Sequence, residues 1–532
     1  MAKRGRPKKV DLDRPDDRIM GIETEYMLGR GQNQRFRTIS ESDPFLDMLI
    51  QYFSNHAACY TWSKGSTFWW LPNGGFLHMD CGHPEFSTPE AANPMELVRF
   101  VRDGDLALRG FCNFARKREG WDGFISRCNT SFDQTTWGSH ESYAVRTQPE
   151  FRNWKRLGGE GWRWLYTRLA RQLSPHLATR IIYTGAGGLS QHDSSCFVLS
   201  PRSEYIEKAE PTSDTQYSRS LINTKEEDLS NDAGLGLRRL HLICGESICS
   251  DIGLYLRVGT TSLILALIER GIRPAHGLKM VPYEDAVSSL NIVNKDLTFT
   301  KIVAERRTRQ YTAIEVQRLY LDQVVKRLNE PWMPSWAPRV VALWSWVLDL
   351  LSDGGAESAT TVLDWALKYR LLAKRLSAYH KLTDERHRDR YLSSEEQRYN
   401  HRNAIYEIDA RFGDVHEDGI FNRLDYQGLL NHSVPEWVEP RPKRVQRLLP
   451  TNPRARVRSL AVNNLQGQDT RVTITWDQII HGRHVLNLAD PFKPNLEWFD
   501  SSSESSRRRS RRSLSSEQKE LQALISEHGR LG

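Results

Sequence analysis

The sequence lacks the cysteine patterns that build disulfide frameworks and zinc ribbons. Its 532 residues include seven cysteines, an odd number, and no two of them are spaced as C-x-x-C. Such a count excludes a simple disulfide framework and is typical of a protein in a reducing compartment. We therefore expect a cytoplasmic protein.

Long hydrophobic runs and a P-loop are also missing. The longest apolar run, around Leu263–Ile268, is far too short to span a membrane, and no secretory signal opens the sequence. No G-x-x-x-x-G-K-[ST] segment occurs, so a P-loop nucleotide site is not indicated. Hydrophobic residues make up 39% and charged residues 26%, which is typical of a globular protein with no membrane contact.

Two short stretches lack acidic residues and carry the excess positive charge. Residues 3–9 and residues 507–512 each hold five basic side chains. Without them the net charge falls from +8 to −2, with 64 basic and 66 acidic residues. Composition therefore argues against a basic nucleic-acid-binding body.

Both basic stretches lie in segments that we expect to be disordered, residues 1–17 and 496–532. Arg4-Gly5-Arg6-Pro7 resembles the core of an AT-hook, a segment that lies in the DNA minor groove, although a solubilising tail is the simpler interpretation. The second segment is rich in Ser and Arg, and it is suited to electrostatic contact with an acidic partner.

Between the tails, strand patterns dominate the first half and helical patterns the second. Short β-branched or aromatic runs predict strands at Arg18–Leu28, Gly75–Cys81, Gly123–Cys128, Ser142–Arg146, Arg180–Thr184, Cys196–Ser200 and Arg239–Cys244. Helices are predicted at Pro94–Arg116, Glu150–Gln172, Ser250–Arg270 and across Ala313–Leu382. Prolines mark a linker at 435–453, before a small α+β unit at 454–495.

Three predicted strands carry polar side chains on one face and apolar side chains on the other. Successive strand residues point to opposite faces, so Glu23 shares a face with Glu25, His78 with Asp80, and Arg239 with His241. Any one such strand fits a solvated outer face. Joined in one antiparallel sheet, the three would gather Glu23, Glu25, Asp80 and His241 on one surface. Carboxylates with imidazole suit a divalent cation such as Mg²⁺ holding nucleotide phosphates.

Motifs in a fixed order resemble the family of enzymes that attach or remove the prokaryotic ubiquitin-like protein Pup. The matching segments are Arg18-Ile-Met-Gly-Ile-Glu-Thr-Glu25, Asn73-Gly with Asp80 and His83-Pro84-Glu85, Gly138-Ser-His-Glu-Ser-Tyr143, Gly185-Ala-Gly187, Ile222-Asn-Thr-Lys-Glu-Glu227, Arg238-Arg-Leu-His241, Val258-Gly-Thr260, Asp364-Trp365, Arg454-Ala-Arg-Val-Arg458 and Trp476. The similarity covers residues 18–492.

The resemblance implies an α+β fold with a glutamine-synthetase-like catalytic domain, assigned to residues 18–434, that uses ATP and Mg²⁺. It matches Asp80 to the catalytic aspartate, Glu23 and Glu85 to metal ligands, and Thr88 and Trp476 to nucleotide contacts. His140 and His241 match family histidines near the same site. We add Glu25, His78 and His241 as candidate metal ligands and Arg239 as a candidate nucleotide contact.

Two positions depart from the family pattern. The family places an arginine that touches ATP where this chain has Phe76, and a tyrosine at a metal position where it has His78. Arg238 or Arg239 could supply the missing phosphate contact, since guanidinium suits phosphate. Imidazole can still bind metal.

The family contains two activities. Local features favour the deamidase/depupylase, which hydrolyses an amide or isopeptide: the spacing from Asp80 to Glu85, Ser139 where ligases usually have cysteine, and the Ser203–Glu207 segment. The alternative is the Pup ligase, which phosphorylates a glutamate of the modifier and joins it to a substrate lysine. The interval from Glu25 to Phe76 is as short as in ligases. A non-catalytic modifier- or nucleotide-binding protein is a further alternative.

Expected partners are a Pup-like modifier and its modified protein substrates, with a functional link to a bacterial proteasome.

Overall fold

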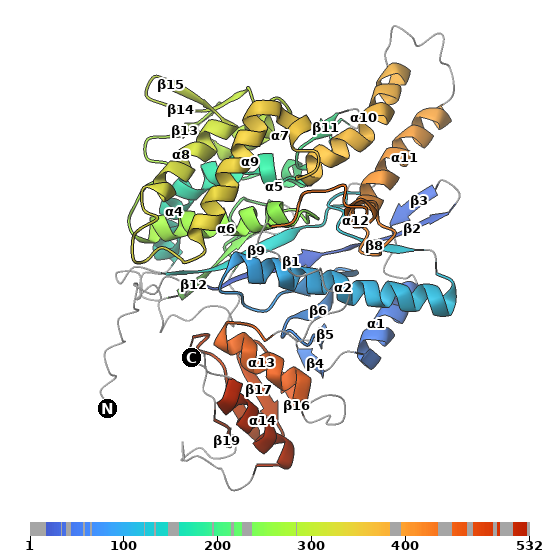
Figure 1. The fold of residues 1–532 in the computed structure, drawn as a ribbon, viewed down its shortest axis with the longest axis vertical. Coiled ribbons are helices and arrows are strands. Elements are labelled where there is room, and N and C mark those ends of the chain that lie inside the picture. Colours follow the sequence, from blue (N-terminus) through green and yellow to red (C-terminus); the bar gives the residue numbers. More distant parts are fainter. Residues whose placement is uncertain are drawn as a thin grey trace.

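The fold is built around a seven-stranded antiparallel sheet. The computed structural model describes residues 18–32, 35–38, 44–56, 59–63, 66–121, 123–131, 135–146, 159–193, 196–213, 218–225, 237–283, 285–383, 395–434, 449–464, 472–492, 497–500 and 514–528. The strand order is β12-β9-β1-β7-β6-β5-β4 (Figure 1). In chain order these strands are β1 (Met20–Glu25), β4 (Cys59–Ser63), β5 (Ser66–Trp70), β6 (Phe76–Asp80), β7 (His83–Ser87), β9 (Ser139–Arg146) and β12 (Leu237–Leu242). The prediction that three polar-faced strands join one antiparallel sheet is confirmed.

The predicted strand Arg18–Leu28 is in fact two strands in two sheets. Its second part, β2 (Met27–Gln32), pairs with β3 (Arg35–Thr38) and β8 (Phe124–Ser126). The chain leaves the main sheet at Tyr26, whose amide donates to the Pro84 carbonyl at 3.0 Å. This switch ends β1 directly after Glu25.

A tight hairpin between β6 and β7 was not predicted. β6 ends at Asp80, and after the turn the chain returns through Pro84 as the central strand β7, opposite β6 and β1. Pro84 is tolerated because the ladder with β1 ends at the pair Glu25 and Glu85, so its missing N–H leaves no ladder bond unmade.

Helices cover the apolar face of the sheet. The two nearest are α2 (Pro94–Glu119), which packs on β1, and α6 (Asp251–Glu269), which packs on β9. The predicted start of α6 is confirmed, because the Ser250 side chain accepts from the Gly253 amide. The helix is apolar and long enough to cross a membrane, but 89% of that window is buried, as in a core helix.

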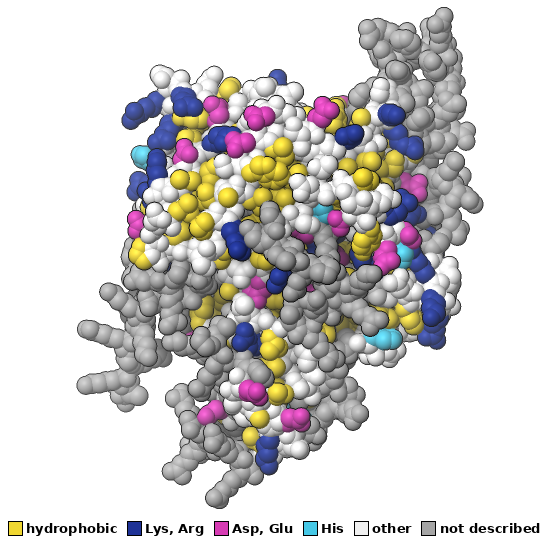
Figure 2. Space-filling view, viewed as in Figure 1, with side chains coloured by type: hydrophobic (Ala, Val, Ile, Leu, Met, Phe, Trp, Pro, Cys, Tyr) yellow, Lys and Arg dark blue, Asp and Glu magenta, His cyan; other side chains and the backbone are white. Residues whose placement is uncertain are grey.

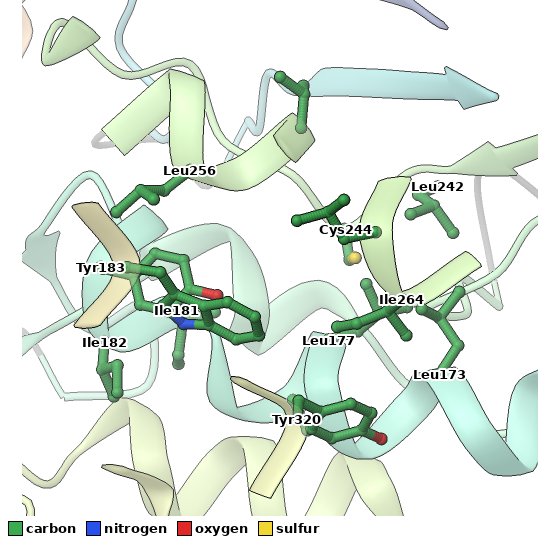
Figure 3. Packing of buried hydrophobic residues seen from close by; sticks show 14 of the residues in the cluster. Leu173, Leu177, Ile181, Ile182, Tyr183, Leu242, Cys244, Leu256, Ile264 and Tyr320 are labelled. Carbon is green, nitrogen blue, oxygen red and sulfur yellow. The ribbon is translucent and has the colours of Figure 1, made fainter. Parts of the chain in front are cut away.

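A large hydrophobic cluster joins the apolar face to further helices. Figure 3 shows side chains gathered there, among them Leu177, Ile182, Ile264 and Tyr320. The remaining helices of this layer are α4 (Gly159–Thr179), α5 (Ile181–Thr184), α7 (Ala286–Asn294), α8 (Ala313–Val325) and α9 (Ala337–Ser358). A second cluster packs α1 (Pro44–His56) against β5, β6 and β7.

The predicted strand Arg180–Thr184 is wrong. Arg180 follows α4, and residues Ile181–Thr184 form the short helix α5, all of them buried. Their β-branched and aromatic side chains favour a strand locally, but packing against α6 overrides that preference. The predicted helix Glu150–Gln172 lies partly outside the described residues and ends later, at Thr179.

The helical second half is confirmed, and small elements complete the domain. Its later helices are α10 (Asp364–Thr383), α11 (Glu395–Phe412) and α12 (Ile420–Tyr426). The smaller elements are the strands β10 (Gly188–Leu189), β11 (Phe197–Val198), β13 (Lys279–Met280), β14 (Ile302–Arg306) and β15 (Arg309–Thr312), and the 3₁₀ helix η2 (Pro201–Tyr205). Figure 2 shows acidic and basic side chains interspersed over the described part of this face, in keeping with the near-neutral body.

The C-terminal unit docks beside β4 and β5 and extends beyond its predicted end at residue 495. It contains α13 (Pro453–Asn464), β16 (Val472–Ile474), β17 (Gln478–His481), β18 (His484–Asn487), β19 (Phe499–Asp500) and α14 (Ser516–His528). The expectation of disorder over residues 496–532 is wrong for α14, because its Leu521 and Ile525 are fully buried in this unit's core. The basic stretches at 3–9 and 507–512 lie outside the described residues.

Candidate functional site

The polar face of the sheet brings candidate residues from five strands side by side. Glu23 of β1 lies opposite His140 of β9 and Ser87 of β7. One step along, Glu25 lies opposite Glu85, and Glu85 lies opposite His78. Side chains in such register stand about 5 Å apart, so the predicted gathering of carboxylates and imidazoles on one surface is present.

Glu23 lies at the centre of one group of contacts. Arg239 Nη2 donates to Glu23 Oε1 at 2.6 Å, while its Nε donates to Ser142 Oγ at 3.0 Å. The other carboxylate oxygen, Oε2, lies 3.6 Å from His140 Nδ1 and 3.5 Å from His241 Nε2. One oxygen therefore faces a guanidinium and the other faces two imidazoles.

Glu25 lies at the centre of a second group. Its Oε2 accepts from the Gly138 amide at 2.5 Å, and its Oε1 lies 3.9 Å from His83 Nε2. Glu25, Asp80 and His83 each offer a ligand atom, and these atoms lie within 4.8 Å of one another, as do those of Glu23, His140 and His241. The candidate metal ligands thus divide into two groups, while His78 and Glu85 lie alongside.

The electrostatics keep both glutamates ionised. Burial alone would raise the pKa of Glu23, but Arg239, His140 and His241 outweigh it and hold that pKa well below its usual value. Burial opposes ionisation of Glu25 as well, yet contact with His83 and the charges of His140 and Arg202 lower its pKa to about 2.

The histidines are suited to bind a ligand. Burial and the Arg239 cation lower the pKa of His241 to about 4, so its ring is neutral at pH 7. Both of its ring nitrogens are buried, and within the described residues neither makes a hydrogen bond of good geometry. Carboxylate oxygens together with an uncharged imidazole such as that of His241 fit a divalent cation. Buried ring nitrogens without a hydrogen bond indicate that a partner is missing.

Asp80 lies at the exposed end of β6, at the rim of the polar face. The next two residues, Cys81 and Gly82, both have positive φ, at 46° and 84°, as a two-residue hairpin turn requires. Asp80 therefore faces His83 across the hairpin and remains open to an incoming substrate.

Phe76 and His78 belong to an aromatic cluster on the same face. The Phe76 ring centroid lies 5.1 Å from that of Trp70, 5.2 Å from that of Trp476 and 5.4 Å from that of His78. Phe76 is only 5% exposed, so it cannot reach a phosphate and serves instead as packing. The candidate substitute, Arg239, contacts Glu23.

The cluster brings Trp476 of the C-terminal unit to the sheet, as a shared nucleotide site would require. Thr88 directly follows β7, and its hydroxyl accepts from the Ile22 amide at 3.0 Å. Trp476 is partly exposed, whereas Thr88 is buried.

Sequence reasoning missed Arg202 and the role of His83. Arg202, on η2, donates to His140 Nε2 at 3.1 Å and to the Ile243 carbonyl at 3.2 Å. It lies outside any strand, so no periodic pattern indicated it. His83 alternates with Glu85 on β7, and that spacing could have identified it.

Glu141 alternates with His140 on β9 and lies on the opposite face of the sheet. It is fully buried and paired with Arg180, whose Nη2 lies 2.5 Å from its Oε1, and it accepts from the Tyr143 hydroxyl at 2.5 Å. Because Glu141 forms an ion pair with Arg180 in the core, its carboxylate cannot reach the polar face.

Comparison with known proteins places the chain in a family. A family model described as Pup-ligase protein matches residues 18–480. The Pup–protein ligase of Paenarthrobacter aurescens (strain TC1) is 29% identical over 491 residues, which cover 90% of this chain and 97% of that ligase. The Pup–protein ligase of Arthrobacter sp. (strain FB24) is 30% identical over 366 residues, 67% of this chain and 74% of that ligase.

Solved structures show the same fold. The complex between Pup and its ligase PafA superimposes with a TM-score of 0.68 at 21% identity, covering 98% of this chain and 94% of that one. PafA with ADP gives a TM-score of 0.62 at 21% identity, covering 94% and 97%. The predicted glutamine-synthetase-like fold is confirmed, and the chain belongs to the Pup ligase family.

Proposed function

We propose that this protein is a cytoplasmic, ATP- and Mg²⁺-dependent ligase that joins the C-terminal glutamate side chain of a Pup-like modifier to lysines of substrate proteins. One observation carries the proposal: carboxylates and histidines converge on one face of a glutamine-synthetase-like sheet, with Asp80 at its open rim. The curated relatives, matched over most of the chain, are Pup–protein ligases.

The ligase is favoured over the deamidase because the relatives are ligases and because the two serines among the deamidase-like features are buried. Between Asp80 and Glu85 the chain makes a tight turn at Cys81 and Gly82. Ser139 is buried and accepts from Arg257 Nη2 at 2.8 Å on the opposite face. Ser203 is buried and donates to Ser200 Oγ at 2.7 Å. The two serine hydroxyls contact Arg257 and Ser200, not the carboxylates of the polar face.

The residues of the site take distinct roles in this proposal. When bound, ATP supplies the phosphoryl group that activates the modifier's carboxylate, and Mg²⁺ offsets the phosphate charge. Glu23, Glu25 and Glu85 would hold the metal, and Trp476 would flank the nucleotide. Asp80, exposed and near His83, is placed to accept the proton of the attacking lysine ammonium.

Conjugation in a purified system tests the proposal. The protein is incubated with Mg·ATP, a lysine-bearing acceptor and a disordered modifier that ends in Gly-Gly-Glu. We expect a covalent conjugate that survives denaturation, with release of ADP only when all components are present. Tight Mg·ATP binding without any conjugate would overturn the ligase assignment.

A non-catalytic binding protein is the second candidate. It is favoured by Phe76, which replaces the family's arginine and is buried among aromatic rings. Such a protein would bind nucleotide or modifier but release no ADP in the same assay.

A further inference from the structure

We infer that Arg458 is a positioning residue of the nucleotide site: it holds Trp476 in place and couples that site to the docking of the C-terminal unit. The part of the inference that concerns nucleotide binding rests on the proposed function. The structural half of the inference rests on contacts between α13, the turn that joins β16 to β17, and the sheet.

Arg458 is fully buried and contacts two indole rings and two backbone carbonyls. Its guanidinium carbon lies 4.3 Å from the ring centroid of Trp476 and 5.3 Å from that of Trp70. Its Nε donates to the Gly74 carbonyl at 2.9 Å and its Nη1 to the Trp476 carbonyl at 3.2 Å. A planar guanidinium can stack on an indole and donate in its own plane at the same time, whereas a lysine ammonium cannot.

Glu90 fixes the orientation of this guanidinium. It accepts from Arg458 Nη2, and it also accepts from Arg454 Nε at 2.6 Å. Arg454 therefore shares the same carboxylate, but the described contacts of Arg454 do not include Trp476. This pair of arginines on α13 offers a matched comparison, since both touch Glu90 and one touches the tryptophan.

Phe76 supports Trp476 from the sheet. The two rings meet edge to face at 61°, and Phe76 also meets Trp70 at 62°. Trp476 is thus held between a stacked guanidinium and an aromatic edge. The inference gives Phe76 a role: this chain uses that position to support the tryptophan.

The test compares Arg458→Lys with Arg454→Lys in two assays. Hydroxyl-radical footprinting without nucleotide measures oxidation of the Trp476 side chain. We expect Arg458→Lys to raise its oxidation rate at least threefold and Arg454→Lys to leave it within 1.5-fold of wild type. Equal rates in wild type and Arg458→Lys, or an equal rise in both variants, would overturn the inference.

Steady-state kinetics then measure the KM for Mg·ATP and kcat. We expect Arg458→Lys to raise this KM about fivefold with kcat within twofold of wild type, and to have no further effect once Trp476→Ala is present. If the changes in KM of the two single variants multiplied in the double variant, Arg458 would act independently of Trp476, and this would also overturn the inference. If the wild-type protein binds no nucleotide while the footprinting contrast holds, the proposed function fails and the nucleotide half of the inference fails with it, but Arg458 still positions Trp476.

Discussion

Arg239 reaches over β9 to pair with Glu23, with Nη2 and Oε1 2.6 Å apart, although their strands are not neighbours. This pair leaves the second oxygen of Glu23 facing His140 and His241. The carboxylate is therefore oriented before any ligand arrives, as is common for metal ligands whose partners fix their direction.

Neutralising Glu23 should weaken metal-dependent nucleotide binding. We expect Glu23→Gln to reduce Mg·ATP affinity about tenfold or more, because phosphate and metal lose an oriented charge. Calorimetry with and without Mg²⁺ measures the change. Glu357→Gln, at an exposed position on α9, is the control and should bind as wild type does. Unchanged affinity in Glu23→Gln would remove Glu23 from the metal site.

Replacing Asp80 should stop the chemistry and leave binding intact. Asp80→Asn keeps the shape of the side chain but cannot accept a proton, so we expect turnover to fall about 10²-fold or more. Mg·ATP affinity and Tm should stay near the wild-type values, since Asp80 is exposed at the end of β6. A variant that still forms conjugates at the wild-type rate would show that Asp80 is structural, with Glu25 as the next candidate.

The contacts of Glu90 should make stability depend on pH. Burial would raise the pKa of Glu90, but Arg458 and Arg454 lower it to about 2 from an ordinary value of 4.5. A depressed pKa contributes stability above pH 4.5, and that contribution is lost as the pH falls toward 2. We expect the unfolding free-energy difference between wild type and Glu90→Gln to narrow by about 2 kcal/mol from pH 6 to pH 3.

Urea unfolding at several pH values measures this difference. A constant gap across that range would contradict the assigned ion pairs. A gap that widens at low pH would mean that the pKa of Glu90 is raised in the folded protein.

The C-terminal helix should contribute to stability. Leu521 is fully buried against the C-terminal unit, so we expect Leu521→Ala to cost about 3 kcal/mol in unfolding free energy. Glu520→Ala, exposed on the same helix, should change it by less than about 0.5 kcal/mol. Equal stabilities of the two variants in denaturant titrations would show that α14 is not docked.

The polar face could be predicted from the sequence, because the alternation of strand residues alone places Glu23, Glu25 and Asp80 on the polar faces of their strands. The sequence could not predict which strands are neighbours, so the pairing of Glu23 with Arg239 came only from the structure. The predicted strand Arg180–Thr184 was wrong, because tertiary packing outweighs the strand preference of β-branched and aromatic residues over so short a segment.

The C-terminal segment contains a helical pattern from which α14 could have been predicted. Gln518, Leu521 and Ile525 recur at helical spacing and are all buried, but the preceding Ser/Arg-rich run led to a prediction of disorder. Phe76 is a different case. The sequence identified it as a departure from the family, and only the neighbouring rings of Trp70 and Trp476 explain what it packs against.

The most direct measurement of the central claim runs ligation and hydrolysis side by side on one preparation. One arm supplies a modifier ending in Gly-Gly-Glu, a lysine acceptor and Mg·ATP, and the other supplies a purified modifier–lysine isopeptide or a modifier ending in Gly-Gly-Gln. We predict ATP-dependent conjugation at least tenfold faster than cleavage or deamidation. Rapid cleavage or deamidation without conjugation would contradict the account and identify a hydrolase.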